Sequence, residues 1–195
     1  MKNLGLIIGL GVIVLIALWL GGFYNSLVGL NEDVAQQWSN VENAYQLRAD
    51  KTQNLVEIVK GAADFERGTL TDVVEARSRA TSVNVDAGDL SPEQIQQFEQ
   101  AQQQFSGALS RLLVTIERYP ELRAVQGFQD FQAQYEGMEN RIGVERRKFN
   151  ETARAYNGKI KRFPGNMLAG MFGFEEKGYF EAAEGTEQAP TISFD

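Results

Sequence analysis

The sequence predicts an all-α membrane protein, in which an N-terminal transmembrane helix continues into an elongated antiparallel four-helix bundle. An uncharged apolar run of membrane length opens the chain, apolar residues then recur at intervals of three and four, and no segment alternates as a strand does. We expect three parts: a transmembrane anchor over residues 1–23, an extracytoplasmic bundle over 24–163, and a membrane-proximal, partly irregular tail over 164–195.

The anchor covers residues 4–23, which carry no charge and have a middle rich in Leu, Ile and Val. These roughly 20 residues rise about 1.5 Å each and so span about 30 Å, the thickness of a bilayer's hydrocarbon layer. A cleaved signal peptide is the competing interpretation. The apolar run is longer than a signal-peptide core and only Gly21-Gly22 offers a weak cleavage site, so a retained anchor is favoured.

Charge around the anchor predicts its orientation. Lys2 and the amino terminus precede the span, whereas Glu32 and Asp33 are the first charges after it and no Lys or Arg follows before Arg48. The positive-inside rule then places the N-terminus in the cytoplasm and the remaining chain outside. The expected location is the cytoplasmic (inner) membrane, crossed once, with the bundle in the periplasm where an outer membrane is present.

Proline and glycine residues indicate where the helices of the bundle end. The first helix is expected to continue from the anchor to about Gly68, and the second to begin near Thr71 and stop at the polar turn 84–89. Ser91 is placed to cap the third helix, with a proline at its first position and Gln94 completing a capping box. Pro120 should end it.

The last helix is expected from about Glu121, and its apolar residues keep the three-four spacing as far as Phe163, before a proline. It matches in length the part of the first helix that lies outside the membrane. Packed antiparallel to that helix, it would return the tail to the membrane.

Composition removes several classes of function. The net charge is −7, which makes nucleic-acid binding unexpected. The chain has no cysteine and no histidine, so it lacks disulfides, thiolate or histidine metal sites, and Ser-His-Asp triads. We therefore expect no catalytic residue, no metal and no cofactor.

Ten polar residues fall close to the buried stripes of the first and last long helices. A carboxylate pair for acid–base chemistry or an oxygen-ligand metal site is one interpretation. The favoured interpretation is a structural polar seam, in which buried ion pairs and amides fix the register of the helices. The seam residues are Arg48, Asp50, Asn54, Glu57, Glu139, Asn140, Arg141, Arg146, Asn150 and Asn157.

The end of the last helix and the tail form a second candidate surface. A basic cluster is followed by apolar and aromatic side chains, a composition that suits a lipid-headgroup interface. It equally suits docking on a neighbouring subunit, or folding back onto the chain's own bundle. The residues are Lys159, Lys161, Arg162, Phe163, Met167, Leu168, Met171, Phe172, Phe174, Tyr179 and Phe180.

Sequence strings from the anchor to the tail resemble the LemA family of bacterial membrane-anchored proteins. They are YNSLV at 24–28, WSNV at 38–41, NLVE at 54–57, VKG at 59–61, ERYPEL at 117–122, EGMENRI at 136–142, FN at 149–150, YN at 156–157, FPGN at 163–166 and YFE at 179–181. The resemblance implies a membrane span, an extracytoplasmic helical bundle, and a structural or adaptor role without a settled biochemical activity. Where the family often has a proline before Asn54, this chain has Gln53, so a straight first helix is expected.

The expected function is a non-enzymatic membrane scaffold that contacts the lipid bilayer and self-assembles through its long helices and C-terminal tail. Long helices in one short bundle should leave apolar faces uncovered, and such faces bind partners. The alternative is an adaptor for another envelope protein, such as a membrane protease or sensor. A hydrolase or metal enzyme that uses carboxylates is disfavoured by the missing histidines.

Overall fold

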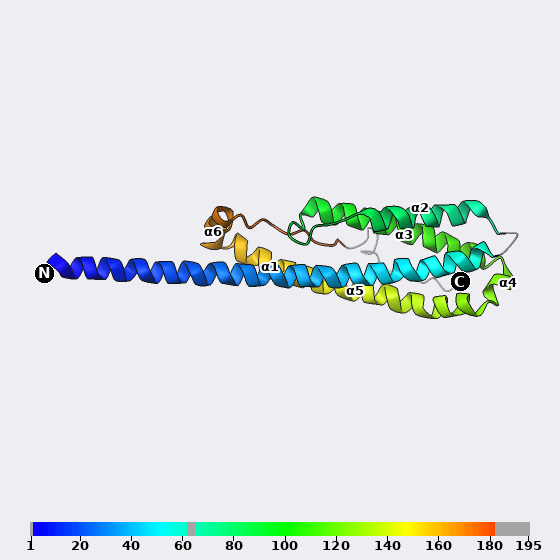
Figure 1. Cartoon of the computed structure of the whole chain (residues 1–195), viewed down its shortest axis with the longest axis horizontal. Coiled ribbons are helices and arrows are strands. Elements are labelled where there is room, and N and C mark those ends of the chain that lie inside the picture. The colour runs from blue at the N-terminus through cyan, green and yellow to red at the C-terminus, as the bar shows by residue number, and fades with distance from the viewer. Residues whose placement is uncertain (1, 62–64, 182–195) are drawn as a thin grey trace, which may run out of the picture.

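The computed structural model describes residues 2–61 and 65–181, and over these residues it has six helices and no strand (Figure 1). Four helices form the bundle: α1 (Lys2–Lys60), α2 (Arg67–Ser82), α3 (Pro92–Ile116) and α5 (Gln126–Lys161). The short α4 (Pro120–Arg123) lies at the bundle's distal end, and α6 (Gly165–Phe172) follows α5. The predicted all-α fold class is confirmed.

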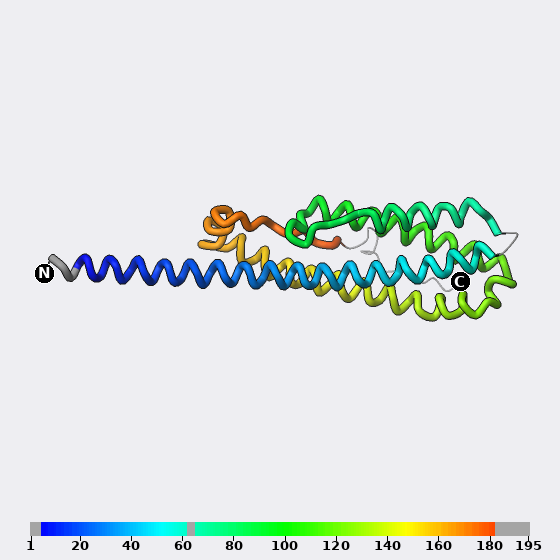
Figure 2. Tube along the Cα trace, viewed as in Figure 1, coloured from blue at the N-terminus to red at the C-terminus, as the bar shows by residue number. Residues whose placement is uncertain are grey.

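The four long helices alternate in direction along one axis, as an antiparallel bundle requires (Figures 1 and 2). The N-terminal part of α1 projects beyond the other helices, and its residues 5–19 are exposed. By length and composition, α1 is the one helix of the described ranges that could cross a membrane. The tail beyond residue 181, included in the predicted third part, lies outside the described residues.

α1 continues from the anchor into the bundle without interruption for 59 residues, which is about 90 Å. It ends at Lys60, eight residues before the Gly68 end that we expected, and Gly61 then donates to the Ile58 carbonyl at 3.2 Å. This short-range bond tightens the last turn and satisfies one of its free carbonyls. α2 begins at Arg67, four residues before the expected Thr71.

The prolines separate the later helices differently from the prediction. α3 stops at Ile116, and Pro120 begins the single turn of α4 because proline fits the first position of a helix. α5 therefore starts at Gln126 and not near Glu121, and it ends at Lys161, before the expected Phe163. α6 was not expected at all.

The start of α3 has half of the predicted capping box. The Ser91 hydroxyl accepts from the Gln94 backbone N–H at 3.4 Å. The Gln94 side chain, however, donates to the Asp89 carboxylate at 2.5 Å and does not return to the cap. The reciprocal bond is absent from this cap because the preceding turn offers a charged acceptor.

Two clusters of buried apolar residues fill the bundle. The distal cluster draws on all four long helices, whereas the proximal cluster, nearer the anchor, includes no described residue of the short α2. Phe180 of the tail, 5% exposed, and residues of the loop 83–90 cover the proximal cluster instead. The proximal cluster is Leu27, Val34, Trp38, Val41, Ala44, Tyr45, Val85, Leu90, Ile95, Phe98, Ile142, Phe149, Ala153, Tyr156, Ile160, Ala169 and Phe180.

Trp38 is fully buried in the proximal cluster, and its ring centroid lies 5.0, 5.6 and 6.0 Å from those of Phe98, Phe149 and Phe180. Trp38→Ala should lower the free energy of unfolding by about 3–5 kcal/mol, because it leaves a cavity among three rings. Val114→Ala, at a side chain that is 65% exposed, should change it by about 0.5 kcal/mol or less. Denaturant unfolding followed by circular dichroism measures both, and equal losses would contradict this core.

Candidate functional site: the polar seam and the membrane-proximal end

A buried charge lies between the two apolar clusters. Arg48 on α1 is 1% exposed, and it donates to Gln102 Oε1 at 2.9 Å and Ser106 Oγ at 2.6 Å, both on α3. It also forms an ion pair with Glu139 Oε1 on α5 at 3.0 Å. A guanidinium stays charged, and burying it is costly unless partners are supplied. The acceptors therefore fix α1, α3 and α5 in one register.

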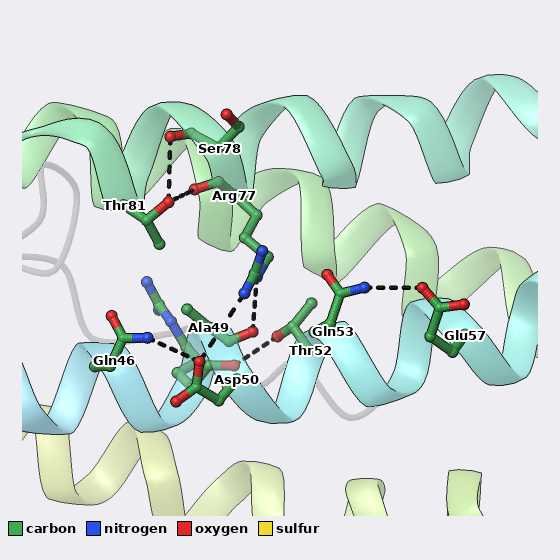
Figure 3. A network of polar contacts seen from close by, with 10 residues as sticks. Gln46, Ala49, Asp50, Thr52, Gln53, Glu57, Arg77, Ser78 and Thr81 are labelled. Atoms are coloured by element: carbon green, nitrogen blue, oxygen red, sulfur yellow. Dashed lines mark hydrogen bonds and ion pairs between the residues drawn. The ribbon is translucent and has the colours of Figure 1, made fainter.

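α2 joins the same network. Gln102 donates to the Ala80 carbonyl at 3.2 Å, which links α3 to α2. Arg77 of α2 donates from Nε to the Ala49 carbonyl at 2.9 Å, and its guanidinium lies 3.9 Å from the Asp50 carboxylate (Figure 3). Polar contacts around Arg48 thus connect all four long helices.

Half of the ten predicted seam residues lie outside the seam, on exposed faces of α1 and α5. Successive helix residues turn by about 100°, so Asp50 points about 200° away from Arg48. Glu57 follows Asp50 by seven residues and therefore lies on the same outer face as Asp50. The carboxylates of Asp50 and Glu57 each accept from a glutamine of α1, Gln46 or Gln53, at 2.8 Å (Figure 3). The exposed five are Asp50, Asn54, Glu57, Asn140 and Arg141.

Arg146 continues the seam toward the anchor. It forms an ion pair with Glu99 of α3, a residue that is only 7% exposed. Arg146 also donates to the Glu181 carbonyl at 2.7 Å, and its guanidinium carbon lies 4.8 Å from the centroid of the Phe180 ring. This ion pair therefore joins α3 and α5 to the tail.

Residues 174–181, which we call the strap, return along the bundle after α6 without helix or strand of their own (Figure 1). Two asparagines of α5 bind the strap backbone. Asn157 accepts from the Lys177 N–H at 3.0 Å and donates to the Lys177 carbonyl at 2.8 Å. Asn150 makes the same pair of bonds with Phe180, at 2.9 and 2.8 Å.

The spacing of the two asparagines matches that of their partners. Seven residues of an α-helix rise about 10.5 Å, and three residues of an extended chain cover about 10 Å. Two asparagine side chains on one face of α5 can therefore pair with positions 177 and 180, as a neighbouring strand would. The seven-residue repeat of an aromatic residue followed by asparagine, at 149–150 and 156–157, was the sequence signal for this arrangement.

Three interpretations were left open for the tail: a lipid interface, docking on a neighbouring subunit, and folding back onto the chain's own bundle. The strap folds back onto the bundle. Phe180 belongs to the proximal cluster, and half-buried Phe174 packs against it. The Phe174 ring centroid lies 5.7 Å from that of Tyr24 and 6.5 Å from that of Tyr156. Phe174 and Phe180 are thus occupied within the chain, whereas Tyr179 is 37% exposed.

Lys177 is a seam residue that the sequence did not reveal. It is 4% exposed, and its Nζ donates to the carbonyls of Gly88 at 2.7 Å and Asp89 at 3.0 Å, which ties the strap to the loop before α3. Burial lowers its pKa, against the opposing effect of nearby acidic residues such as Asp89. The next residue, Gly178, crosses α3 so closely that a Cβ would lie 2.8 Å from Pro92 Cα. No helical period marks Lys177, because the strap has none.

α6 closes the membrane-proximal end of the bundle against α1. A Cβ on Gly165, at the start of α6, would lie 2.2 Å from the Lys159 carbonyl oxygen and 3.1 Å from the Phe23 ring. At its other end, the Phe172 ring meets Tyr24 edge-on, with 5.2 Å between the centroids. The tail therefore lies where α1 leaves the bundle, as the helix lengths predicted.

Exposed apolar side chains beyond the anchor gather at this end. Phe163, Met167 and Met171 are 80%, 69% and 64% exposed, and Leu168 is half-buried. Basic residues accompany them at the end of α5. The predicted contact residues found here are Lys159, Lys161, Arg162, Phe163, Met167, Leu168, Met171 and Phe172.

The polar groups of the bundle are arranged for packing. Within the described ranges, no group of three or more Asp, Glu, His or Cys side chains is placed to hold a metal ion. A recess of 360 Å³ opens beside Tyr45 and Gln102. Burial raises the pKa of Tyr45, despite the charges of Arg146 and Arg48 nearby, so its hydroxyl stays protonated at neutral pH.

The fold and the site define a class: a membrane-associated helical bundle whose buried polar contacts join four helices and a C-terminal strap. The chain belongs to the LemA family, which matches residues 37–194. A relative described as Magnetosome protein MamQ 2, from Paramagnetospirillum magneticum, is 29% identical over 81% of this chain and 64% of its own length. The chain thus spans just under two thirds of that relative.

Two further relatives extend the comparison. Magnetosome protein MamQ of Magnetospirillum gryphiswaldense is 28% identical over 80% of this chain and 64% of the relative. Protein LemA of Metamycoplasma hominis is 26% identical over 86% of this chain and 76% of the relative. None of these names states a reaction.

Replacing both strap-binding asparagines, Asn150→Ala with Asn157→Ala, should release the strap while the helices persist. Each substitution leaves a backbone N–H and carbonyl without their partner, at a cost of about 1–3 kcal/mol. Hydrogen exchange of residues 174–181 should accelerate at least ten-fold, measured by mass spectrometry. Asn140→Ala, on the exposed face of the same helix, is the matched control and should leave exchange unchanged. Unchanged exchange in the double variant would contradict the strap.

Stability should depend on Tyr156 at alkaline pH. Burial, with the charge of Glu175, raises its pKa from 10.0 to about 12. A raised pKa in the folded state stabilises the protein below the unfolded value, and that contribution is lost as pH rises from about 10 to 12. The free energy of unfolding of the natural chain, relative to that of Tyr156→Phe, should therefore fall by about 2 kcal/mol across this window. Unfolding titrations of both chains across this window measure the trend, and a constant difference between them would contradict it.

Proposed function

We propose that the chain is a non-enzymatic structural protein of the cytoplasmic membrane, which self-assembles through its anchor and its membrane-proximal end. In this proposal the N-terminus is cytoplasmic and the bundle stands outside, as the charges flanking the anchor indicate. The bundle then acts as a rigid post, and lateral contacts form at its base.

One observation carries the proposal. Outside the anchor, the most exposed large apolar side chains of α5 and the tail are Phe163, Met167 and Met171, and they lie together at the base. Water-exposed apolar groups in such a cluster indicate a surface that meets a partner. Met167 and Met171 are four residues apart on α6 and so share one face, which a neighbouring subunit could cover. Methionine adapts its shape readily to such a contact.

The anchor offers a second surface for lateral assembly. Gly5 and Gly9 form a small-xxx-small pattern in an apolar helix, and a Cβ built on either would meet no described atom within 4 Å beyond its chain neighbours and the adjacent backbone of the helix. Such a pattern allows two membrane helices to approach closely. Gly9 precedes Phe23 by 14 residues, about 20 Å along α1, so the anchor and α6 would contact neighbours at different depths.

The long helices of the bundle contribute less than the sequence led us to expect. On the described part of α2 to α5, the exposed large apolar residues are Val74, Val114 and Val125, which belong to three different segments. Two apolar clusters and a polar seam already cover the inner faces. The proposal therefore places self-assembly at the base of the molecule.

Cysteine cross-linking tests this arrangement directly, because the chain has no cysteine of its own. Met167→Cys in native membranes should form a disulfide-linked dimer on mild oxidation. Val114→Cys, equally exposed at 65% but far along α3, is the matched control and should remain monomeric. Dimer yield is read from non-reducing gels.

Absence of a Met167→Cys dimer would overturn the proposal. A Met167→Cys adduct with a different protein would instead support the adaptor role. Cross-linking through both positions would restore the long helices as contact surfaces.

A further inference from the structure

A recess of 640 Å³ lies at the base of the bundle, between the part of α1 that leaves the membrane and the end of α5. Two aromatic residues of α1, Trp19 and Phe23, form one side of it. The other side carries basic residues from α5 and the turn that follows. Its lining is Trp19, Phe23, Glu151, Arg154, Ala155, Gly158, Lys159, Arg162, Phe163, Pro164 and Gly165.

We propose that this recess binds the phosphate of an anionic phospholipid in the membrane leaflet that the bundle faces. The site differs from the face of Met167 and Met171 used for self-assembly, since neither methionine lines the recess. The inference rests on the anchoring part of the proposed function and is independent of self-assembly.

The position of the recess along α1 sets it at headgroup level. The uncharged run covers residues 4–23 and accounts for about 30 Å of hydrocarbon. Trp19 and Phe23 are therefore at the boundary between acyl chains and headgroups, where aromatic side chains concentrate. A phosphate at this depth belongs to a lipid of the same bilayer.

The charge of the recess favours an anion. Three cations line it, Arg154, Lys159 and Arg162, against the single carboxylate of Glu151. The Lys159 ammonium is 5.4 Å from the Phe23 ring centroid, which keeps it beside α1. Within the described residues, neither Arg154 nor Arg162 forms a salt bridge, and both side chains are exposed, so their guanidinium groups are accessible to an anion. An arginine fork is suited to bidentate binding of phosphate oxygens.

The recess also offers a place for the apolar part of a lipid. Phe163 is 80% exposed at its rim, and Trp19 is 50% exposed on the opposite wall. Both can contact the first methylenes of the acyl chains while the arginines hold the phosphate. The recess thus places basic groups for the phosphate next to apolar side chains for the acyl chains, as in a phospholipid the phosphate lies next to the acyl chains.

Native mass spectrometry of the full chain in a mild detergent tests the proposal, with dioleoyl phosphatidylglycerol or dioleoyl phosphatidylcholine added in equal amounts. The natural chain should retain phosphatidylglycerol at least five-fold more than phosphatidylcholine. Arg154→Gln with Arg162→Gln should remove this preference. Arg141→Gln with Arg147→Gln makes the same charge change on exposed α5 residues farther from the anchor, and should keep it.

Equal retention of the two lipids by the natural chain, or equal loss of preference in both double variants, would overturn the proposal. Inorganic phosphate added in excess should leave the bound lipid in place, and displacement by it would show that the recess prefers a free anion. Circular dichroism of each variant confirms folding. The native mass spectra also report the oligomer mass, so failure of lipid binding is distinguishable from failure of self-assembly.

Discussion

The arrangement of the whole bundle depends on the burial of one guanidinium. Arg48 is 1% exposed and cannot become neutral, so the helices around it must present oxygen acceptors at fixed places. Gln102 and Glu139 provide these acceptors from α3 and α5. Gln102 also donates to the Ala80 carbonyl and so links α2 to the same network. Replacing such a network by apolar groups often costs little stability, whereas removing one partner costs much. Its effect here is to select one register from those that two apolar clusters alone would permit.

That register has consequences for the rest of the chain. α2 is only 16 residues long, so it leaves the proximal part of α1, α3 and α5 without a fourth helix. The strap supplies the missing cover with Phe180, and its backbone is satisfied by Asn150 and Asn157. Because the strap must reach back to these asparagines, α6 is held between it and the end of α5. The base of the molecule is therefore positioned by contacts made farther up the bundle.

Apolar periodicity was sufficient to predict the long helices of the bundle, because their buried faces are set by local spacing. It also predicted that Arg48, Arg146 and Asn157 would be structural neighbours of the core. It failed for Asp50 and for Gln102 and Ser106, the α3 partners of Arg48, since which polar residue of a helix faces inward depends on the register of other helices. The strap has no period to detect, and the eight residues of α6 are too few for apolar spacing to distinguish them from an irregular tail.

Side chains that are paired within the chain differ in kind and in place from those left exposed. Polar groups that resemble catalytic ones, such as the carboxylates of Glu99 and Glu139, are held by arginines of neighbouring helices. The exposed side chains that the sequence marked as a contact surface are apolar and basic, and they lie at the base, where α1 leaves the bundle. The middle of the bundle is occupied by contacts that fix its register, so the proposed function assigns binding to the methionine, phenylalanine and arginine side chains at its base. Under that proposal the polar seam contributes indirectly, since Asn150, Asn157 and Arg146 hold the strap and thereby the position of α6.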